Sequence, residues 1–203
     1  MDHSRAVKKY VSESMDLKRA ILDDEELVQR TGDAVDALVK SFKNGGQAFF
    51  CGNGGSAADA QHLAAELSGR LNFDRAPLPA EAFTVNTSFL TAVGNDYSFD
   101  DIYKRSVEGF CKKGDVLFGI STSGNSENVL RAQIAAKKKG VTVISLTGKD
   151  GGKIKRYCDI LLNIPSSNTQ HVQEGQVVLG HIICELVEAT LFAKKEKKAK
   201  RSR

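Results

Sequence analysis

The 203-residue sequence predicts an α/β protein, a three-layer sandwich in which a five-stranded parallel sheet lies between helices. Short apolar segments, typical of buried parallel strands, alternate along the chain with longer stretches of helical apolar spacing. Two of the segments end in a glycine-rich or serine-rich loop that leads directly into a helix. In such folds ligands bind beyond the carboxyl ends of the strands. The length of the chain fits a single domain over residues 1–193.

Two amphipathic helices precede the first strand and form an N-terminal helical extension over residues 1–43. Apolar residues at helical spacing predict the first helix over residues 6–22. The second is predicted over residues 33–42, with Gly32 before it and Asn44-Gly45-Gly46 closing it. Because both lie outside the strand–helix alternation, we expect their apolar faces to pack on the sheet or on another subunit.

The first strand, predicted over residues 47–51, runs into a loop that favours ligand binding. Gly52, Gly54 and Gly55 allow a sharp turn and a close approach to a bound group, and Ser56 is suited to cap the following helix. A loop of this kind presents free N–H groups and a positive helix end to an anionic or hydroxylated ligand.

On that helix, His62 and Glu66 are four residues apart and project from one face. The spacing alone also fits an exposed, weakly interacting His–Glu pair.

A second loop of this kind follows the strand predicted over residues 116–120. It reads Ser121-Thr122-Ser123-Gly124-Asn125-Ser126 and leads into a helix predicted over residues 127–139. Hydroxyls, backbone N–H groups and a helix N-terminus together suit a phosphomonoester. A serine-rich capping turn explains one of these serines but not four hydroxyl groups, so we predict a phosphate site.

The remaining elements complete the alternation and end in a long helix. That helix, over residues 169–192, carries Gln173 and His181, which lie about 80° apart around the axis and can face one site. His181 among apolar neighbours also fits a hydrogen-bonded core histidine. Further strands are predicted over residues 81–85, 141–146 and 159–164, helices from residue 88 and over 100–111, and turns at 94–97 and 150–152.

Composition and charge exclude several classes of protein. Hydrophobic residues make up 41% and charged residues 27%, as in ordinary soluble proteins. The sequence lacks both an uninterrupted apolar run of membrane length and a hydrophobic signal segment. We therefore expect a cytoplasmic protein without membrane contact. The four cysteines are scattered, so free, buried thiols are expected rather than a disulfide or a zinc–thiolate site.

The net charge of +4 comes from the C-terminus, because residues 194–203 hold seven basic residues and one acid. This segment is predicted to be a disordered basic tail. The rest of the chain is slightly acidic, which argues against nucleic-acid binding.

Several motifs in a fixed order resemble the phosphoheptose isomerase family, over roughly residues 5–192. They are the Cys-Gly-Asn-Gly-Gly-Ser-Ala-Ala-Asp-Ala-Gln-His run at 51–62 with Glu66 and Arg70, Gly94-Asn95-Asp96, the serine loop 121–126, and Gln173-Glu174 with His181. The resemblance implies the sugar-isomerase (SIS) fold with flavodoxin-like topology. It also implies conversion of sedoheptulose 7-phosphate to D-glycero-D-manno-heptose 7-phosphate, for lipopolysaccharide or surface glycans, by a homotetramer with sites at subunit interfaces.

Matched residue by residue, the resemblance implies roles for individual side chains. The sugar is expected on Asn53, Gly54, Gly55, Asn95 and Asp96, with Glu66 and Gln173 also at the substrate, and the phosphate on Ser121, Thr122, Ser123 and Ser126. One zinc ion per subunit is expected on His62, Glu66, Gln173 and His181. Glu66 and His181 match the family's acid–base pair, whereas His171 stands where the family often has an arginine.

Two other function classes share this fold. A replication-initiation regulator resembles the family at many of the same positions, so a non-catalytic binding protein is the main alternative. The serine loop of that regulator carries an arginine within the run that contains Ser123 in this chain. Its first loop lacks the second glycine, which is Gly55 in this chain. Both differences favour the enzyme. A sugar-phosphate-sensing regulatory domain is usually fused to a second domain, for which 203 residues leave no room.

Overall fold

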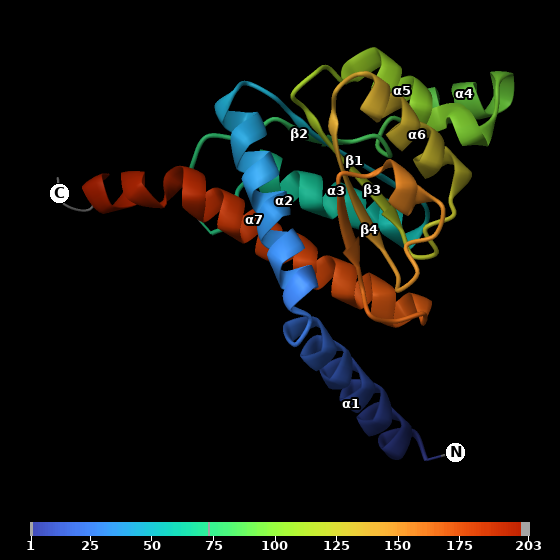
Figure 1. Cartoon of the computed structure of the whole chain (residues 1–203), viewed down its shortest axis with the longest axis vertical. Helices are drawn as coiled ribbons and strands as arrows, with labels where there is room; N and C mark the ends of the chain where they lie inside the picture. Colours follow the sequence, from blue (N-terminus) through green and yellow to red (C-terminus); the bar gives the residue numbers. More distant parts are fainter. Residues whose placement is uncertain (1, 73, 200–203) are drawn as a thin grey trace.

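A computed structural model describes residues 2–72 and 74–199, with the backbone alone for residues 193–199. Its five strands form one parallel sheet in the order β2-β1-β3-β4-β5 (Figure 1). The strands are β1 Ala48–Gly52, β2 Ala80–Ala82, β3 Val116–Ser121, β4 Thr142–Thr147 and β5 Ile160–Asn163. The predicted α/β fold with flavodoxin-like strand order is confirmed.

Helices cover both faces of the sheet and complete the three layers. They are α1 His3–Leu22, α2 Glu25–Lys43, α3 Gly55–Ser68, α4 Thr87–Asp96, α5 Ile102–Phe110, α6 Glu127–Lys138 and α7 Thr169–Ala199, with short 3₁₀ helices η1 Phe99–Asp101 and η2 Ile154–Tyr157. One apolar cluster joins the sheet to α2, α3, α7 and the end of α1. A second cluster joins the opposite face to α4, α5 and α6.

The pleat of the strands explains why β1 and β3 are buried along their whole length. Phe50 and Phe118 stack with ring centroids 4.8 Å apart on the face covered by α2, α3 and α7. Their chain neighbours Phe49 and Leu117 belong to the other cluster. Since successive side chains in a strand point to opposite faces, strands in the middle of a sheet covered on both sides are buried at every position.

The first helix extends away from the rest of the molecule (Figure 1). Its buried residues, Leu17 and Ile21, lie near its C-terminal end. Val7, Val11 and Met15 are more than half exposed, at 61%, 56% and 65%. They repeat at intervals of four residues, so α1 carries an exposed apolar stripe.

The second helix begins at Glu25, eight residues before the predicted start, so that prediction was wrong. The Asp24 side chain caps it by accepting a hydrogen bond from the Leu27 N–H at 2.9 Å. Gly32 lies inside this helix, in open space. Glycine is an unfavourable residue within a helix, but its cost of about 1 kcal/mol does not end a helix whose apolar face is buried.

Two other segments differ from the sequence prediction. Strand β2 ends at Ala82 rather than Val85, although the Phe83 N–H still donates to the Phe50 carbonyl at 2.9 Å. The predicted turn at residues 94–97 begins as the last turn of α4, because this helix runs on through Gly94 to Asp96.

The cysteines are free thiols, as the sequence predicts, and Cys51, Cys111 and Cys184 are buried. Cys158 is partly exposed.

The last helix passes beside the sheet and extends past it (Figure 1). Its Thr169–Phe192 part is long and apolar enough to cross a membrane by length and composition, a property that core helices of soluble proteins share. Here it packs against α2 and α3. The backbone of α7 continues to Ala199, into the segment predicted to be a disordered tail, and residues 200–203 lie outside the described chain. The tail assignment stays a prediction.

Candidate active site

The loop between β1 and α3 is shaped by its glycines. A Cβ atom on Gly52 would lie 2.7 Å from the Ser56 carbonyl oxygen, so a side chain does not fit there. Gly54, at the N-cap position of α3, has a φ of 57°, which favours glycine. Within the described chain this N-terminus has no side-chain cap, and its Ser56 and Ala57 N–H groups donate to the Asn53 and Gly54 carbonyls at 3.0 Å instead. The positive end of the α3 dipole therefore has no side-chain partner there and suits an anionic or hydroxylated ligand.

The serine loop between β3 and α6 has the same arrangement. Ser126 is the N-cap residue of α6, but its hydroxyl lies 3.0 Å from the Ser121 hydroxyl and makes no capping bond within the described chain. The Ser123 hydroxyl accepts from the Asn125 N–H at 3.2 Å. The positive end of the α6 dipole therefore lies among hydroxyl groups, which is an arrangement suited to an anion.

A glycine turn after β4 holds the serine loop in place. A Cβ on Gly124 would lie 2.2 Å from the Gly151 carbonyl oxygen, and one on Gly152 would lie 2.3 Å from the Gly124 carbonyl oxygen. The Ile154 N–H donates to that Gly124 oxygen at 3.0 Å, and the Lys153 N–H donates to Asn125 Oδ1 at 3.1 Å. The two backbones touch because glycine occupies both sides of the contact.

An amide pair links the first ligand loop to the start of α6, directly after the serine loop. Asn53 Nδ2 donates to Asn128 Oδ1, and Asn128 Nδ2 donates to Asn53 Oδ1, both at 2.9 Å. The Tyr103 hydroxyl donates to the Gly52 carbonyl at 2.5 Å. Burial raises the pKa of Tyr103 above its usual range, so the hydroxyl keeps its proton and remains a donor. These bonds fix the first loop against the start of α6.

A cluster of three potential metal ligands lies between α3 and α7. The Nε2 atoms of His62 and His181 are 2.7 Å apart, and Glu66 Oε1 lies 3.5 Å from His62 Nε2. One ligand atom from each residue lies within 4.8 Å of the other two. Two imidazole nitrogens and a carboxylate oxygen are the donor set of many catalytic zinc sites, which use three protein ligands and keep a fourth position open.

Gln173 lies nearer the glycine loop, where its side-chain amide packs on Gly55. A Cβ on Gly55 would lie 2.2 Å from Gln173 Nε2. Both residues line a pocket of about 500 Å³ together with Lys18, Asp59 and Glu174. Within the described chain Asp59 Oδ2 is buried and has no hydrogen-bond partner. Burial raises the pKa of Asp59, and the nearby His62 opposes that shift.

Comparison with known proteins identifies the family. The family model for the SIS domain matches residues 9–148. The phosphoheptose isomerase of Clostridium acetobutylicum is 48% identical over 189 residues, covering 93% of this chain and 96% of that protein. The chain belongs to the phosphoheptose isomerase family.

Other family members agree over a similar length. The phosphoheptose isomerase of Mycobacterium tuberculosis is 47% identical over 193 residues, covering 95% of this chain and 98% of the relative. The solved phosphoheptose isomerase of Neisseria gonorrhoeae has a TM-score of 0.86 at 42% identity and covers 92% of this chain and 98% of that chain. The protein is therefore an isomerase, and these relatives lend no support to the non-catalytic alternative.

The structure brings most of the predicted phosphoheptose isomerase site residues together, but not all. Both ligand loops lie at one edge of the sheet, and His62, Glu66 and His181 form one cluster. Asn95 and Asp96 lie on α4, which packs against α5 and η1 and is drawn apart from α3 and α7 in Figure 1. Asn95 donates to its neighbour Asp96 at 2.8 Å.

The sequence prediction of the site missed three residues that the structure places beside it: Asn128, Tyr103 and Asp59. Asn128 follows the serine loop by two residues, and Asp59 lies one turn before His62 on the same helix face, so their positions gave some signal. Tyr103 gave none, because its contact joins residues 51 positions apart.

The amide pair yields a first prediction. Replacing Asn128 with Asp puts a carboxylate oxygen against Asn53 Oδ1, and the lost buried hydrogen bond should cost about 1–3 kcal/mol in the free energy of unfolding. Asn168→Asp is the control, because Asn168 is exposed and its oxygen, which accepts from the Gln170 N–H, is retained. Urea denaturation of both variants measures the difference. Equal stabilities would show that the pair does not hold the loops.

Proposed function

We propose that the protein interconverts sedoheptulose 7-phosphate and D-glycero-D-manno-heptose 7-phosphate, and that this reaction supplies heptose for lipopolysaccharide or other surface glycans. Relatives named phosphoheptose isomerase match nearly the whole chain at 47–48% identity, and this observation carries the proposal. The adjacency of Glu66 and His181, on helices that are far apart in the sequence, supports it further.

The phosphate of the substrate binds the serine loop in this proposal. Ser121, Thr122, Ser123 and Ser126 supply hydroxyl groups, and the N-terminus of α6 supplies N–H groups and a positive dipole. The packing of Gly124 against Gly151 and Gly152 supports this role, since a preformed loop loses little entropy when the ligand binds.

The sugar binds between the glycine loop and α7. Asn53, Gly54 and Gly55 face it from the first loop, Glu66 and Gln173 from the helices, and Asn95 and Asp96 complete the set. The pocket lined by Gly55 and Gln173 supports this assignment. Because Asn95 and Asp96 lie on α4, apart from α3 and α7, we propose that a neighbouring subunit supplies them.

Isomerisation moves a proton between adjacent carbons through an enediol, which requires a base at carbon and an acid at the carbonyl oxygen. We assign Glu66 as the base that takes the carbon proton and His181 as the acid that protonates the oxygen. His62 lies 3.5 Å from the Glu66 carboxylate and 2.7 Å from the His181 ring nitrogen. It can therefore orient both groups.

His62, Glu66 and His181 would also hold one zinc ion per subunit, with Gln173 as the fourth ligand. The donor set fits, although tetrahedral zinc needs ligand nitrogens about 3.3 Å apart, so the two imidazole rings must separate by roughly half an ångström. Gln173 is eight residues, or about 12 Å along the helix axis, from His181, so its side chain must extend toward the cluster. When bound, zinc supplies Lewis-acid stabilisation of negative charge on the substrate oxygens.

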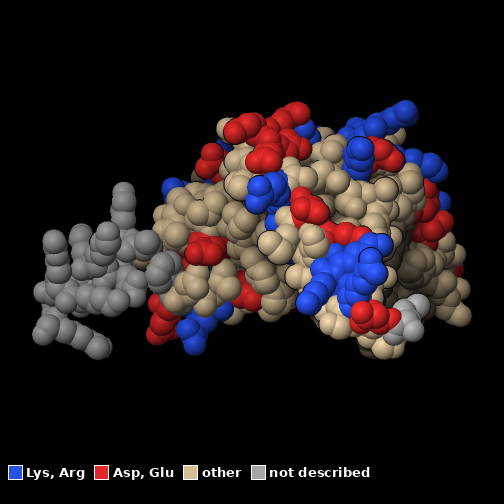
Figure 2. Space-filling view, turned by 90° about the horizontal axis from the view of Figure 1, so that it is seen from below, with Lys and Arg blue, Asp and Glu red and all other residues tan. Residues whose placement is uncertain are grey.

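The protein acts as a homotetramer in the cytoplasm in this proposal. The exposed apolar stripe of α1 supports assembly, because contiguous apolar surface often marks a protein–protein contact. On the face shown in Figure 2, basic and acidic side chains are interspersed, which supports the absence of a nucleic-acid partner.

The activity itself is tested by incubating purified protein with sedoheptulose 7-phosphate and following the aldose by NMR. Glu66→Gln keeps the shape of the side chain but removes the base, so turnover should fall about a hundredfold to ten-thousandfold. Glu185→Gln, an exposed change on α7, should leave turnover unchanged. Isomerisation by Glu66→Gln at the wild-type rate would overturn the acid–base assignment. If the wild type is inactive but binds a protein partner tightly, the non-catalytic alternative is correct.

The metal proposal is tested by elemental analysis after dialysis against zinc. We expect about one zinc per chain in the wild type and a clear loss in His62→Ala, which removes one of the three clustered ligands. His3→Ala, on the exposed first turn of α1, is the matched control. Full zinc content in His62→Ala would show that the ion binds elsewhere.

The assembly proposal is tested by light scattering at micromolar concentration. The wild type should have four times the chain mass of 22.0 kDa. Val11→Lys puts a charge in the apolar stripe and should reduce this mass, whereas Ser12→Lys on the same exposed helix should not. A wild-type monomer would contradict the proposal.

A further inference from the structure

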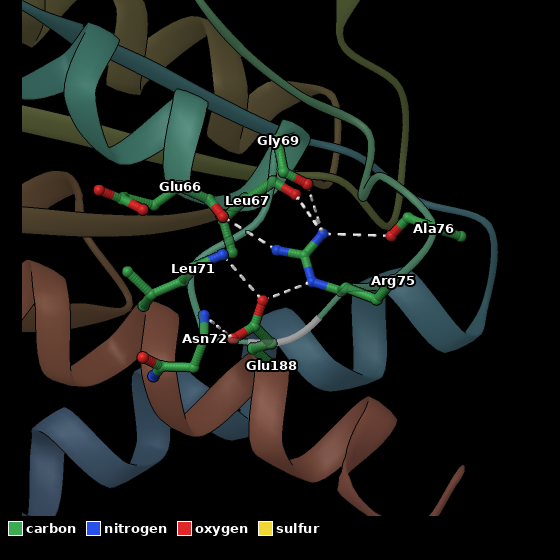
Figure 3. Close-up of polar contacts among 8 residues, drawn as sticks. All are labelled: Glu66, Leu67, Gly69, Leu71, Asn72, Arg75, Ala76 and Glu188. Atoms are coloured by element: carbon green, nitrogen blue, oxygen red, sulfur yellow. Dashed lines mark hydrogen bonds and ion pairs between the residues drawn. The ribbon is translucent and has the colours of Figure 1, made fainter. Parts of the chain in front are cut away.

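A buried ion pair joins the segment after α3 to α7 (Figure 3). Arg75 Nε donates to Glu188 Oε1 at 2.8 Å, and the two side chains are 1% and 0% exposed. Glu188 also accepts from the backbone N–H groups of Leu71 at 2.9 Å and Asn72 at 2.6 Å. Both carboxylate oxygens therefore have donors in the protein.

The guanidinium group of Arg75 caps the C-terminal end of α3. It donates to the Glu66 carbonyl at 2.9 Å, to the Leu67 carbonyl at 2.8 Å and to the Gly69 carbonyl at 3.1 Å (Figure 3). The last carbonyls of a helix lack partners within the helix and carry a partial negative charge, so a cation is well placed there. One of these carbonyls belongs to Glu66, the proposed base.

The cost of this arrangement suggests a role beyond stability. Removing two charges from water is expensive, and well-packed apolar residues often replace a buried ion pair without loss of stability. Burial alone would raise the pKa of Glu188, but the two N–H groups and Arg75 outweigh it and lower the pKa. The carboxylate is thus ionised at neutral pH and remains an acceptor for all its partners.

The position of the pair relates it to the proposed site. Glu188 follows His181 by seven residues, or two turns of α7, so the two side chains are about 20° apart around the helix. Arg75 holds the last turn of α3, which carries Glu66, and Glu188 holds α7, which carries His181. The network thereby fixes the axial position of one helix against the other at the cluster where His62, Glu66 and His181 meet.

We propose that Arg75 and Glu188 are positioning residues that set the alignment of α3 and α7, and with it the distance between the Glu66 carboxylate and the His181 imidazole. This inference rests on the proposed function, since it assigns the pair to the isomerase site. It adds to that function two residues that touch neither substrate nor metal.

The test replaces both charges with apolar side chains of similar size, Arg75→Met with Glu188→Leu. In the folded variant, turnover should fall about a hundredfold, because a displacement near 1 Å in an active site has that effect. Zinc affinity should fall about tenfold to a hundredfold, as it does when residues behind the ligands are lost. The affinity for inorganic phosphate should not change, because the serine loop lies on other elements. Glu188→Gln is a second variant that keeps the shape but leaves the buried Arg75 cation unpaired and turns an amide N–H toward one of the donors, so its folded fraction should show the same pattern.

An exposed ion pair provides the control: Lys104→Met with Glu108→Leu on α5, where the side chains are 42% and 52% exposed. It should change none of the three values. A purely structural role would change at most the melting temperature and leave turnover, zinc affinity and phosphate affinity of the folded fraction at wild-type values. That result overturns the proposal.

Two readouts separate this proposal from the proposed function. Zinc titration needs no substrate, so it reports on alignment even if the wild type does not isomerise. Imidazole ¹⁵N NMR needs neither substrate nor metal, and it follows the contact of 2.7 Å between His62 and His181. The ¹⁵N signals of both rings should shift in the apolar double variant and in Glu188→Gln. Signals identical to those of the wild type would overturn the positioning role whatever the catalytic activity is.

Discussion

The parallel pairing of β1 with β3 is the constraint on which the rest of the site depends. The two strands are neighbours at the point where the strand order reverses, with Cys51 opposite Gly119 and Gly52 opposite Ile120. Because both strands run in one direction, both end at the same edge of the sheet, and the helices that follow begin side by side. The amide pair between Asn53 and Asn128 is a direct result, since it joins the first residue beyond β1 to the first turn of α6.

The close approach of α3 and α7 is the second requirement, and small residues allow it. A Cβ on Gly180 would lie 2.6 Å from a Leu63 methyl carbon, so glycine beside His181 lets α7 contact α3 beside His62. Gly55 has the same relation to Gln173 about two turns earlier on both helices. The two helices run in the same direction from the ligand edge, which puts the His62, Glu66 and His181 cluster beyond the glycine loop.

The sequence was sufficient for the fold and for the local parts of the site, because those depend on neighbouring residues. Alternating strands and helices predicted the sheet, and the hydroxyl-rich run predicted the serine loop at a helix N-terminus. The start of α2 was missed because Gly32 suggested a boundary, although Asp24 carried the real capping signal. The bonds of Asn128 to Asn53 and of Arg75 to Glu188 join residues 75 and 113 positions apart, which spacing along the chain does not reveal.

We propose that one edge of the sheet brings a phosphate loop and a His–Glu–His cluster into a single isomerase site. A crystal structure with zinc and sedoheptulose 7-phosphate, recorded at the zinc absorption edge, tests it most directly. We expect an anomalous peak about 2.0–2.2 Å from the ligand atoms of His62, Glu66 and His181, with the phosphate hydrogen-bonded to the serine loop at the N-terminus of α6. A zinc ion on other residues, or a phosphate bound away from that helix, would contradict it.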